Sequence, residues 1–138
     1  MEKCIVSSNK SKLDINLVHS FLTKTDWAKG RTLPEVKKTI TNSDCYGIYI
    51  DNRQIGFARI VTDYTAFAYL MDVFIIEPFR GKGYSKKLLT SIFEDSKYMN
   101  VKKWLLATTD AHGLYQKFGF KPLESPEKIM QKSKPNDM

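Results

Sequence analysis

The sequence has few of the residues that hold a small fold together through covalent bonds or metal ions. Cys4 and Cys45 are its two cysteines, and it has two histidines. These are too few, and lack the spacing, for a disulfide framework or a set of metal ligands. We therefore expect no metal, and a reducing cytoplasm as the location of the protein.

Long hydrophobic segments are also missing. The longest apolar run lies near Val73–Ile76, whereas a helix that spans a bilayer needs about 20 residues. The first ten residues, MEKCIVSSNK, lack the apolar centre of a secretory signal. Seven glycines and five prolines are too few for a fibrous or disordered chain. We expect a folded protein with no membrane partner.

What the chain does contain is sufficient for one hydrophobic core. It has 138 residues, of which 42% are hydrophobic, and this is the size of a single domain. We place that domain at 1–131 and a polar C-terminal tail at 132–138. The net charge of +7 favours anionic ligands, nucleic acid or an anionic membrane, although basic residues that serve solubility alone would give the same balance. Part of the positive charge gathers at four residues: Arg80, Lys82, Lys86 and Lys87.

The pattern of apolar residues predicts strands and helices in an irregular alternation, which is typical of the α+β (mixed α/β) class around one sheet. Turn and cap residues set most of the boundaries. The expected elements of the first half are a strand at 4–7, a helix at 13–22, a polar joint at 23–31, a helix that opens with the capping box Thr32–Glu35, and hairpin strands at 46–50 and 55–61. Those of the second half are a long strand at 67–76, a helix at 83–97, a strand at 104–107, a helix from a cap at Thr109 or Asp110 to Phe118 before Gly119, and a weak last strand at 129–130.

The segment with the clearest chemical meaning is Arg80-Gly81-Lys82-Gly83-Tyr84-Ser85, which opens the helix after the long strand. A helix start leaves amide N–H groups without partners and carries partial positive charge. Glycines give a ligand access to the backbone, and Arg80 and Lys82 add fixed charge. Together these features predict a pyrophosphate cradle. A glycine-loosened basic turn without a ligand is the alternative.

This segment resembles a signature of the GNAT superfamily of N-acetyltransferases, [Q/R]-x-x-G-x-[G/A]. Arg80 and Gly83 match its first two defined positions, and Ser85 stands where Gly or Ala is usual. Leu114–Phe120, LYQKFGF, is similar to the family's L-Y-x-K-x-G-F motif downstream. The resemblance extends from about Cys4 to Gln131 and points to compact stand-alone bacterial members. It implies a twisted, mostly antiparallel sheet of about six or seven strands with about four flanking helices, in which the central strands splay apart.

The resemblance also implies a cofactor site and a general acid. Acetyl-CoA would bind through its pyrophosphate to the backbone from Arg80 to Ser85, and through its pantetheine arm to Val73, Phe74 and Ile75. Tyr115 would protonate the departing thiolate, although by itself it could equally be one more packed aromatic residue. His112 would border the CoA channel, or serve as a base or a cap.

Asp72 is the carboxylate of greatest interest because it interrupts an apolar strand, where an unpaired charge is costly. We consider it a catalytic base or an anchor for the substrate ammonium. The alternative is a structural ion pair with a cation such as Arg59. Glu77, His112 and a water chain are other candidates for the base, and Glu77 is equally well explained as a solvated turn residue.

Three further residues are candidates for binding the acceptor. Trp27 and Arg31 lie in the joint at 23–31, which forms one wall of the acceptor site in the resembled family. An aromatic ring there suits a cationic amine, and Arg31 suits a carboxylate. The alternative is an ordinary polar loop that binds no ligand. Tyr64, in the connection before Phe67, is a weaker candidate.

The sequence therefore predicts an N-acetyltransferase that moves the acetyl group of acetyl-CoA directly to a primary amine of an unidentified small-molecule or peptide acceptor. The alternative is a non-catalytic sensor or interaction module that binds acyl-CoA. A nucleic-acid binder is disfavoured, because no zinc-finger spacing, RNP aromatic motif or helix-turn-helix pattern is present. A homodimer is possible.

Overall fold

The computed structural model describes residues 3–134, so residues 135–138 of the expected tail lie outside the described range. The chain divides into two compact units. The first unit extends to Ala107 and the second begins at Thr108. The first contains the sheet and three helices, and the second contains one short helix.

The first unit is built on a mixed sheet of five strands in the order β1-β2-β3-β4-β5. Neighbouring strands are antiparallel, except that β4 and β5 are parallel. The strands are β1 (Cys4–Ser7), β2 (Asp44–Ile50), β3 (Arg53–Thr62), β4 (Ala68–Ile75) and β5 (Trp104–Leu105).

The structure confirms the α+β class, but the expected six or seven strands are wrong. No strand follows Leu105 among residues 3–134. The expected last strand at 129–130 is unpaired: Ile129 is 52% exposed and Met130 is 92% exposed. Two apolar residues form a strand only where a neighbouring edge takes up their backbone groups, and these two have none.

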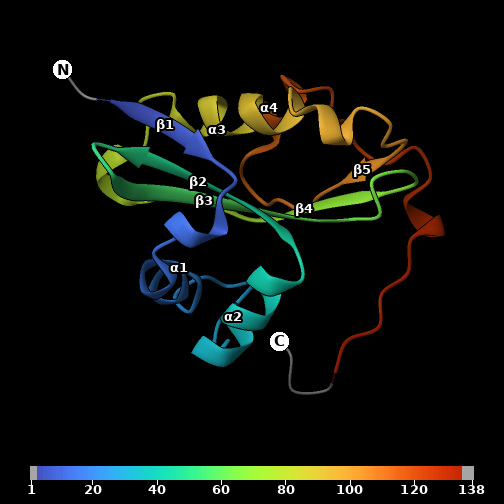
Figure 1. The fold of residues 1–138 in the computed structure, drawn as a ribbon. Helices are drawn as coiled ribbons and strands as arrows, with labels where there is room; N and C mark the ends of the chain where they lie inside the picture. Colours follow the sequence, from blue (N-terminus) through green and yellow to red (C-terminus); the bar gives the residue numbers. More distant parts are fainter. Residues whose placement is uncertain (1–2, 135–138) are drawn as a thin grey trace. The chain divides into compact units, whose positions relative to one another are not determined.

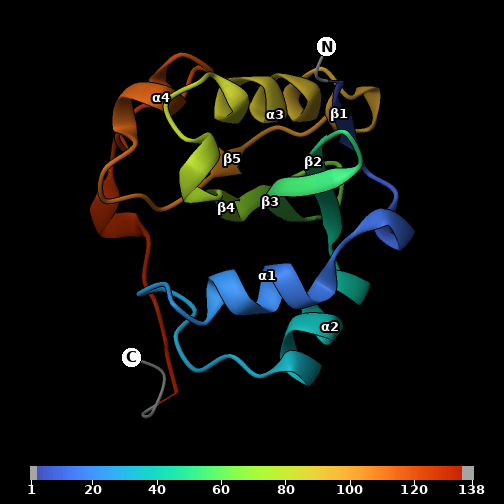
Figure 2. The same ribbon diagram turned by 90° about the vertical axis from the view of Figure 1, so that its left-hand side faces the viewer.

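Helices cover both faces of the sheet in the first unit. Helices α1 (Ile15–Leu22) and α2 (Leu33–Thr41) lie on one face, and α3 (Tyr84–Phe93) lies on the other (Figures 1 and 2). The predicted capping box opens α2: the amide of Glu35 donates to the Thr32 hydroxyl at 3.2 Å, and the amide of Thr32 donates to Glu35 Oε1 at 2.7 Å. Helix α1 begins two residues later than predicted because Asp14 caps it, accepting from the amide of Leu17.

The main core lies between the helix pair α1–α2 and the sheet. Its buried residues are Val18, Leu22, Ala28, Val36, Ile40, Cys45, Phe57 and Phe74. Because Ala28 belongs to the polar joint between α1 and α2, this core also fixes the joint against the sheet. On the opposite face α3 buries Leu88, Leu89 and Ile92.

Two irregularities in β4 shape the site. Between the pairs Phe57↔Phe74 and Arg59↔Met71, β3 contributes one residue and β4 contributes two, so β4 bulges at Asp72 and Val73. Asp72 takes φ = +56° there, a left-handed conformation that Asp tolerates better than most side chains. In addition, β4 pairs with β5 only at Ala68 and Tyr69. Within the described residues, β4 therefore has no neighbouring strand on that edge after Tyr69.

The second unit contains α4 (His112–Gln116). The prediction that Thr109 or Asp110 would be the N-cap residue of α4 is wrong. Ala111 holds that position, and its amide donates to the hydroxyl of Thr108 at 3.0 Å. Gly119 follows the helix with φ = +92°, which confirms the expected left-handed stop. None of the helices in the described part of the chain has the length and apolar character that a membrane crossing needs.

Candidate active site

The glycine turn at 80–85 connects a short 3₁₀ turn (Glu77–Phe79) to the start of α3. Gly81 and Gly83 adopt φ = +75° and +86°, and Gly83 is the N-cap of α3. A Cβ atom added to either glycine would meet no atom within 4 Å. Both positions therefore face open space, and glycine is required there for its backbone conformation and not for packing.

The backbone donors of this turn differ along its length. The amide of Arg80 donates to the carbonyl of Glu77 at 3.1 Å. Among residues 3–134, no acceptor is found for the amides of Gly81, Lys82, Gly83 and Ser85. The row of available donors therefore begins at Gly81 and not at Arg80, and it ends in the first turn of α3, where unpaired amides suit an anion.

Arg80 is held by the end of β4 and by α1. Its Nε donates to the carbonyl of Ile75 at 2.8 Å, and its guanidinium lies 5.8 Å from the ring centre of Phe21. Phe21 in turn stacks on Phe74 with ring centres 3.9 Å apart. These contacts fix the guanidinium beside the turn, close to the open edge of β4.

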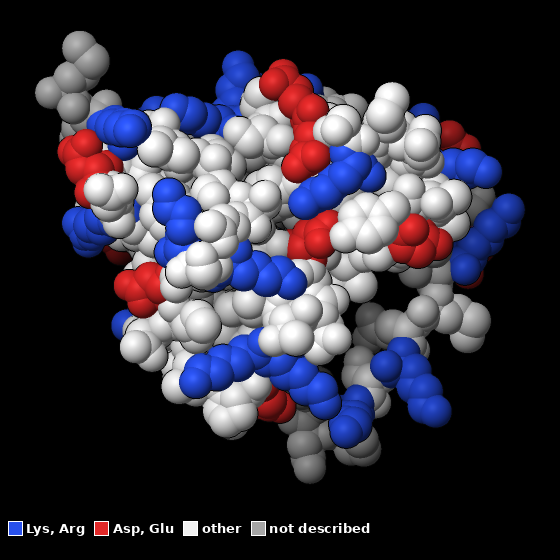
Figure 3. All heavy atoms as spheres, viewed as in Figure 1, with Lys and Arg blue, Asp and Glu red and all other residues white. Residues whose placement is uncertain are grey.

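The side chains of Lys82 and Tyr84 lie against Phe79. The ammonium of Lys82 is 5.9 Å from the ring centre of Phe79, and the ring of Tyr84 meets Phe79 edge-on at 6.2 Å. Basic side chains are interspersed with acidic ones across the face shown in Figure 3.

Asp72 is the centre of a buried ion cluster. Its side chain is 0% exposed, and its two carboxylate oxygens accept three hydrogen bonds. Trp27 Nε1 donates to Oδ1 at 3.0 Å, while Arg31 Nη1 and Arg59 Nε donate to Oδ2 at 2.8 and 2.9 Å. The structure thus brings together three predicted site residues (Trp27, Arg31 and Asp72) that lie up to 45 positions apart.

These contacts favour the ion-pair alternative for Asp72. A base must offer a lone pair to the substrate proton, whereas this carboxylate is occupied by two guanidinium groups and one indole. A catalytic role for Asp72 stays a prediction that the contacts do not support. Glu77 is exposed at the start of the 3₁₀ turn (Glu77–Phe79). This agrees with its interpretation as a solvated turn residue.

Arg59 and Ser43 complete the cluster. Arg59 Nη1 donates to the Ser43 hydroxyl at 2.9 Å, and its Nη2 lies 3.1 Å from the sulfur of Met71. Neither Ser43 nor Met71 was predicted as a site residue. The ion pair of Arg59 and Asp72 could be predicted, because each charged residue interrupts an apolar strand. No pattern in the sequence indicates that Ser43 and Met71 contact Arg59.

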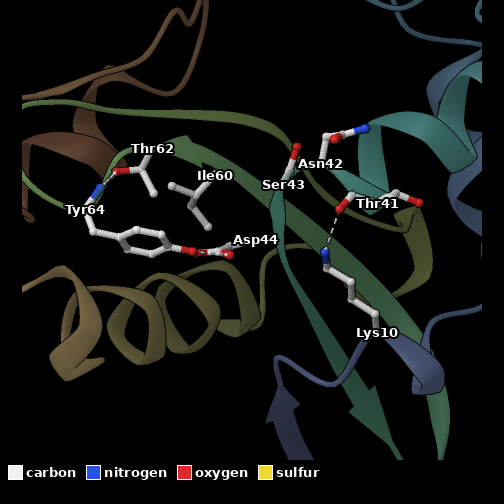
Figure 4. Close-up of a pocket in the computed structure, with 8 residues that line it drawn as sticks. All are labelled: Lys10, Thr41, Asn42, Ser43, Asp44, Ile60, Thr62 and Tyr64. Carbon is white, nitrogen blue, oxygen red and sulfur yellow. Dashed lines mark hydrogen bonds between the residues drawn. The ribbon is translucent and has the colours of Figure 1, made fainter.

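Tyr64 lies in a different place. Its hydroxyl is 2.7 and 2.8 Å from the two carboxylate oxygens of Asp44, and this hydrogen bond, together with burial, raises the pKa of Tyr64 to about 12. The residue lines a cavity of about 320 Å³ (Figure 4). The walls of this cavity include neither Trp27, Arg31 nor Asp72; they are formed by Lys10, Thr41, Asn42, Ser43, Asp44, Ile60, Thr62 and Tyr64.

The predicted acid and the predicted channel residue both lie in the second unit. Tyr115 is 8% exposed and its ring meets Phe120 at 6.0 Å. Burial, with a smaller contribution from Asp110, raises its pKa to about 12, so the phenol keeps its proton at neutral pH. His112 is exposed at the first position of α4. Among residues 3–134, no group of three His, Cys, Asp or Glu side chains is arranged to hold a metal ion.

Comparison with known proteins connects these features to one family. The sequence model of the acetyltransferase (GNAT) family matches residues 15–120. A protein from Xanthomonas campestris pv. campestris that belongs to the GNAT family has a similar structure, with 42% identity, a TM-score of 0.92, and coverage of 96% of this chain and 94% of that chain.

More distant structures share the fold. The GNAT family acetyltransferase SP0256 of Streptococcus pneumoniae is 16% identical, with a TM-score of 0.70 and full coverage of both chains. An acetyltransferase from Clostridium acetobutylicum, solved with acetyl-CoA, is also 16% identical, with a TM-score of 0.67 and 96% coverage of each chain.

Proposed function

Because the chain belongs to the acetyltransferase (GNAT) family, we propose that it is an N-acetyltransferase, which transfers the acetyl group of acetyl-CoA directly to a primary amine. The observation that carries this proposal is the turn at 81–85. There the amides of Gly81, Lys82, Gly83 and Ser85 have no acceptor among residues 3–134, and two open glycines adjoin a helix start. These are the requirements for binding a diphosphate.

The residues present fit acetyl-CoA at two places. The amides from Gly81 to Ser85, with the charges of Arg80 and Lys82, would hold the pyrophosphate, and Tyr84 would lie beside it. The open edge of β4 at Val73, Phe74 and Ile75 would bind the amides of the pantetheine arm. This edge otherwise leaves backbone groups of a central strand without a neighbouring strand, which is costly when they are buried.

Acetyl-CoA supplies the electrophile, a thioester carbonyl. An acceptor present as ammonium would first lose one proton to water. Its neutral nitrogen would then form a bond to the carbonyl carbon, the carbon–sulfur bond would break, and the nitrogen would lose a second proton to water. Tyr115 gives its phenolic proton to the departing sulfur and regains one from solvent. This direction of transfer needs a protonated phenol, and Tyr115, whose pKa burial raises to about 12, is protonated at neutral pH. His112 would border the channel.

Trp27 and Arg31 would form the acceptor wall, because Asp72 fixes both beside the bulge of β4. Asp72 then acts as a positioning residue. Tyr64 stays a weaker prediction, since its hydroxyl is occupied by Asp44. The small-molecule or peptide nature of the acceptor and the possible homodimer also stay predictions.

The proposal is tested with acetyl-CoA, a panel of primary amines and a thiol reagent that detects released CoA. We expect release above background with at least one amine, and thermal protection of the protein by CoA. CoA binding without turnover of any amine would instead indicate a sensor, and no protection by CoA would remove the basis of the proposal.

Tyr115→Phe tests the general acid. Loss of a general acid costs about 100-fold or more in rate, so we expect kcat to fall by that factor while CoA affinity changes less than about threefold. Tyr46→Phe is the control, because it removes a hydroxyl bonded to Asp95 at the far end of α3. Equal losses in both variants would contradict the assignment.

The pH dependence of kcat gives a second test. Since the pKa of Tyr115 is about 12, the phenol remains protonated well above neutral pH. We expect no fall in kcat between pH 8 and about 10. A fall in this range that is absent in Tyr115→Phe would show that the phenol ionises near its ordinary pKa.

A further inference from the structure

The two arginines that share Asp72 differ in how many of their donors are used. Arg59 is 7% exposed and has a partner for all three guanidinium nitrogens: Asp72, Ser43 and Met71. Arg31 is 18% exposed, and its Nη1 donates to Asp72. Among residues 3–134, the Nε and Nη2 of Arg31 have no acceptor.

The charges of this cluster do not cancel. Arg31 and Arg59 both pair with Asp72, and neither forms another ion pair with a described residue. Two positive charges therefore face one negative charge in a largely buried place. An uncompensated charge that is partly removed from water is unfavourable unless an anion accompanies it.

The free side of Arg31 has the geometry that an oxyanion needs. In a guanidinium group the Nε–H and one Nη2–H are parallel and lie on the same edge. This edge matches the two oxygens of a carboxylate or phosphate in a bidentate contact. The adjacent Trp27 is 55% exposed, and its Nε1 donates to the same carboxylate as Arg31 Nη1.

The location separates this edge from the phosphates of the cofactor. Asp72 lies three residues before the end of β4, about 10 Å along a strand, and the glycine turn follows that end. With the pantetheine arm on Val73–Ile75, as proposed above, an anion at Arg31 would lie toward the thioester end of acetyl-CoA and away from the pyrophosphate. The acceptor must lie at that thioester end.

We propose that the acceptor is an amine that carries an anionic group, a carboxylate or a phosphate, and that the Nε–Nη2 edge of Arg31 binds this group. That the bound molecule is the acetyl acceptor rests on the proposed function. Binding of an anion at Arg31 does not depend on turnover. The Asp72 side chain is 0% exposed and both of its oxygens already accept hydrogen bonds, so recognition comes from the anion and not from the amine.

The test measures equilibrium binding to the protein saturated with CoA, using acetylated products in matched pairs. N-acetylglycine is compared with N-acetylglycinamide, and N-acetylphosphoethanolamine with N-acetylethanolamine. We expect the anionic member of at least one pair to bind about tenfold or more tightly than its neutral partner. The pair that shows this preference identifies the group as carboxylate or phosphate.

Two variants assign the preference to Arg31. Arg31→Gln should reduce it below about threefold, and Arg31→Lys, which keeps the charge for Asp72 but lacks the fork, should reduce it as well. Thermal unfolding checks that each is folded. Lys29→Gln is the matched control, since it removes one exposed positive charge from the same joint and should leave the preference intact.

The outcomes separate the two proposals. A preference that depends on Arg31 supports the anion site even if no amine is turned over, and turnover of neutral and anionic amines alike would support acetyl transfer while overturning the anion site. Equal or absent affinity in both pairs, or a preference that survives in Arg31→Gln and Arg31→Lys, also overturns it.

Discussion

The end of β4 and the 3₁₀ turn (Glu77–Phe79) separate the ion cluster at the bulge from the glycine turn. The two features nevertheless differ in whether their polar groups have partners. In the turn, the amides of Gly81, Lys82 and Gly83 have no acceptor within the described part of the chain, and both glycines face open space. In the cluster, side chains from distant positions satisfy every oxygen of a buried carboxylate. The turn therefore has donors available for the proposed ligand, whereas most polar groups of the cluster already have partners within the chain.

This difference shows where binding and stability reside. A ligand can occupy the turn without breaking any contact of the folded chain. Loss of Asp72, or of one of its arginine partners, would leave a buried charge without its counterion. This lowers the free energy of unfolding. Within the described residues, the exception inside the cluster is the free edge of Arg31, so we expect any ligand of the cluster to bind at that edge.

The largest effect is expected for Asp72→Asn. Asn tolerates the positive φ of this position, so the substitution removes the charge while keeping the backbone. Arg31 and Arg59 then face each other without an anion, and we expect the free energy of unfolding to fall by about 3 kcal/mol. Urea unfolding measures this loss. Glu94→Gln, an equal charge change at an exposed position after α3, should change stability by less than about 0.5 kcal/mol. Similar values for both would show that the cluster contributes nothing special.

A smaller effect on stability but a clear one on binding is expected for Gly83→Ala. A side chain at φ = +86° costs about 1 kcal/mol, and the added methyl group stands where the diphosphate would approach. We expect CoA affinity to fall about tenfold. Gly30→Ala is the control, because Gly30 has φ = +83° and equal free space; it should show the same loss of stability with unchanged CoA affinity. Unchanged affinity in Gly83→Ala would place the diphosphate elsewhere.

The smallest effect is expected for Lys82→Ala. An exposed lysine contributes about 0.5 kcal/mol to the binding of an anion. CoA should therefore bind about two- to threefold more weakly to the variant at low salt. The difference should vanish near 1 M salt because of screening. Calorimetric titration at two salt concentrations checks this, with Lys103→Ala as an exposed control outside the turn. A loss that persists at high salt would indicate a direct, desolvated contact.

Much of the fold could be predicted because its signals are local. The capping box at Thr32–Glu35 and the stop at Gly119 depend on a few adjacent residues, and both were confirmed. The hairpin between β2 and β3 was also confirmed: Asp51 and Asn52 take φ = +48° and +70°, as a tight two-residue turn requires. The strand at 129–130 failed for the converse reason, since a strand needs a partner that no local pattern supplies.

The candidate site divides along the same line. The sequence by itself determined the glycine turn, because the conformations of Gly81 and Gly83 and the donors of a helix start arise from neighbouring residues. The tertiary structure alone decided the rest of the site. It produced the bulge at Asp72, brought Trp27, Arg31 and Arg59 to one carboxylate, and left a free edge on Arg31 but not on Arg59. Contacts across more than 40 positions exist only after the sheet and the joint between α1 and α2 have packed together, and charge balance in a buried place depends on which groups meet there.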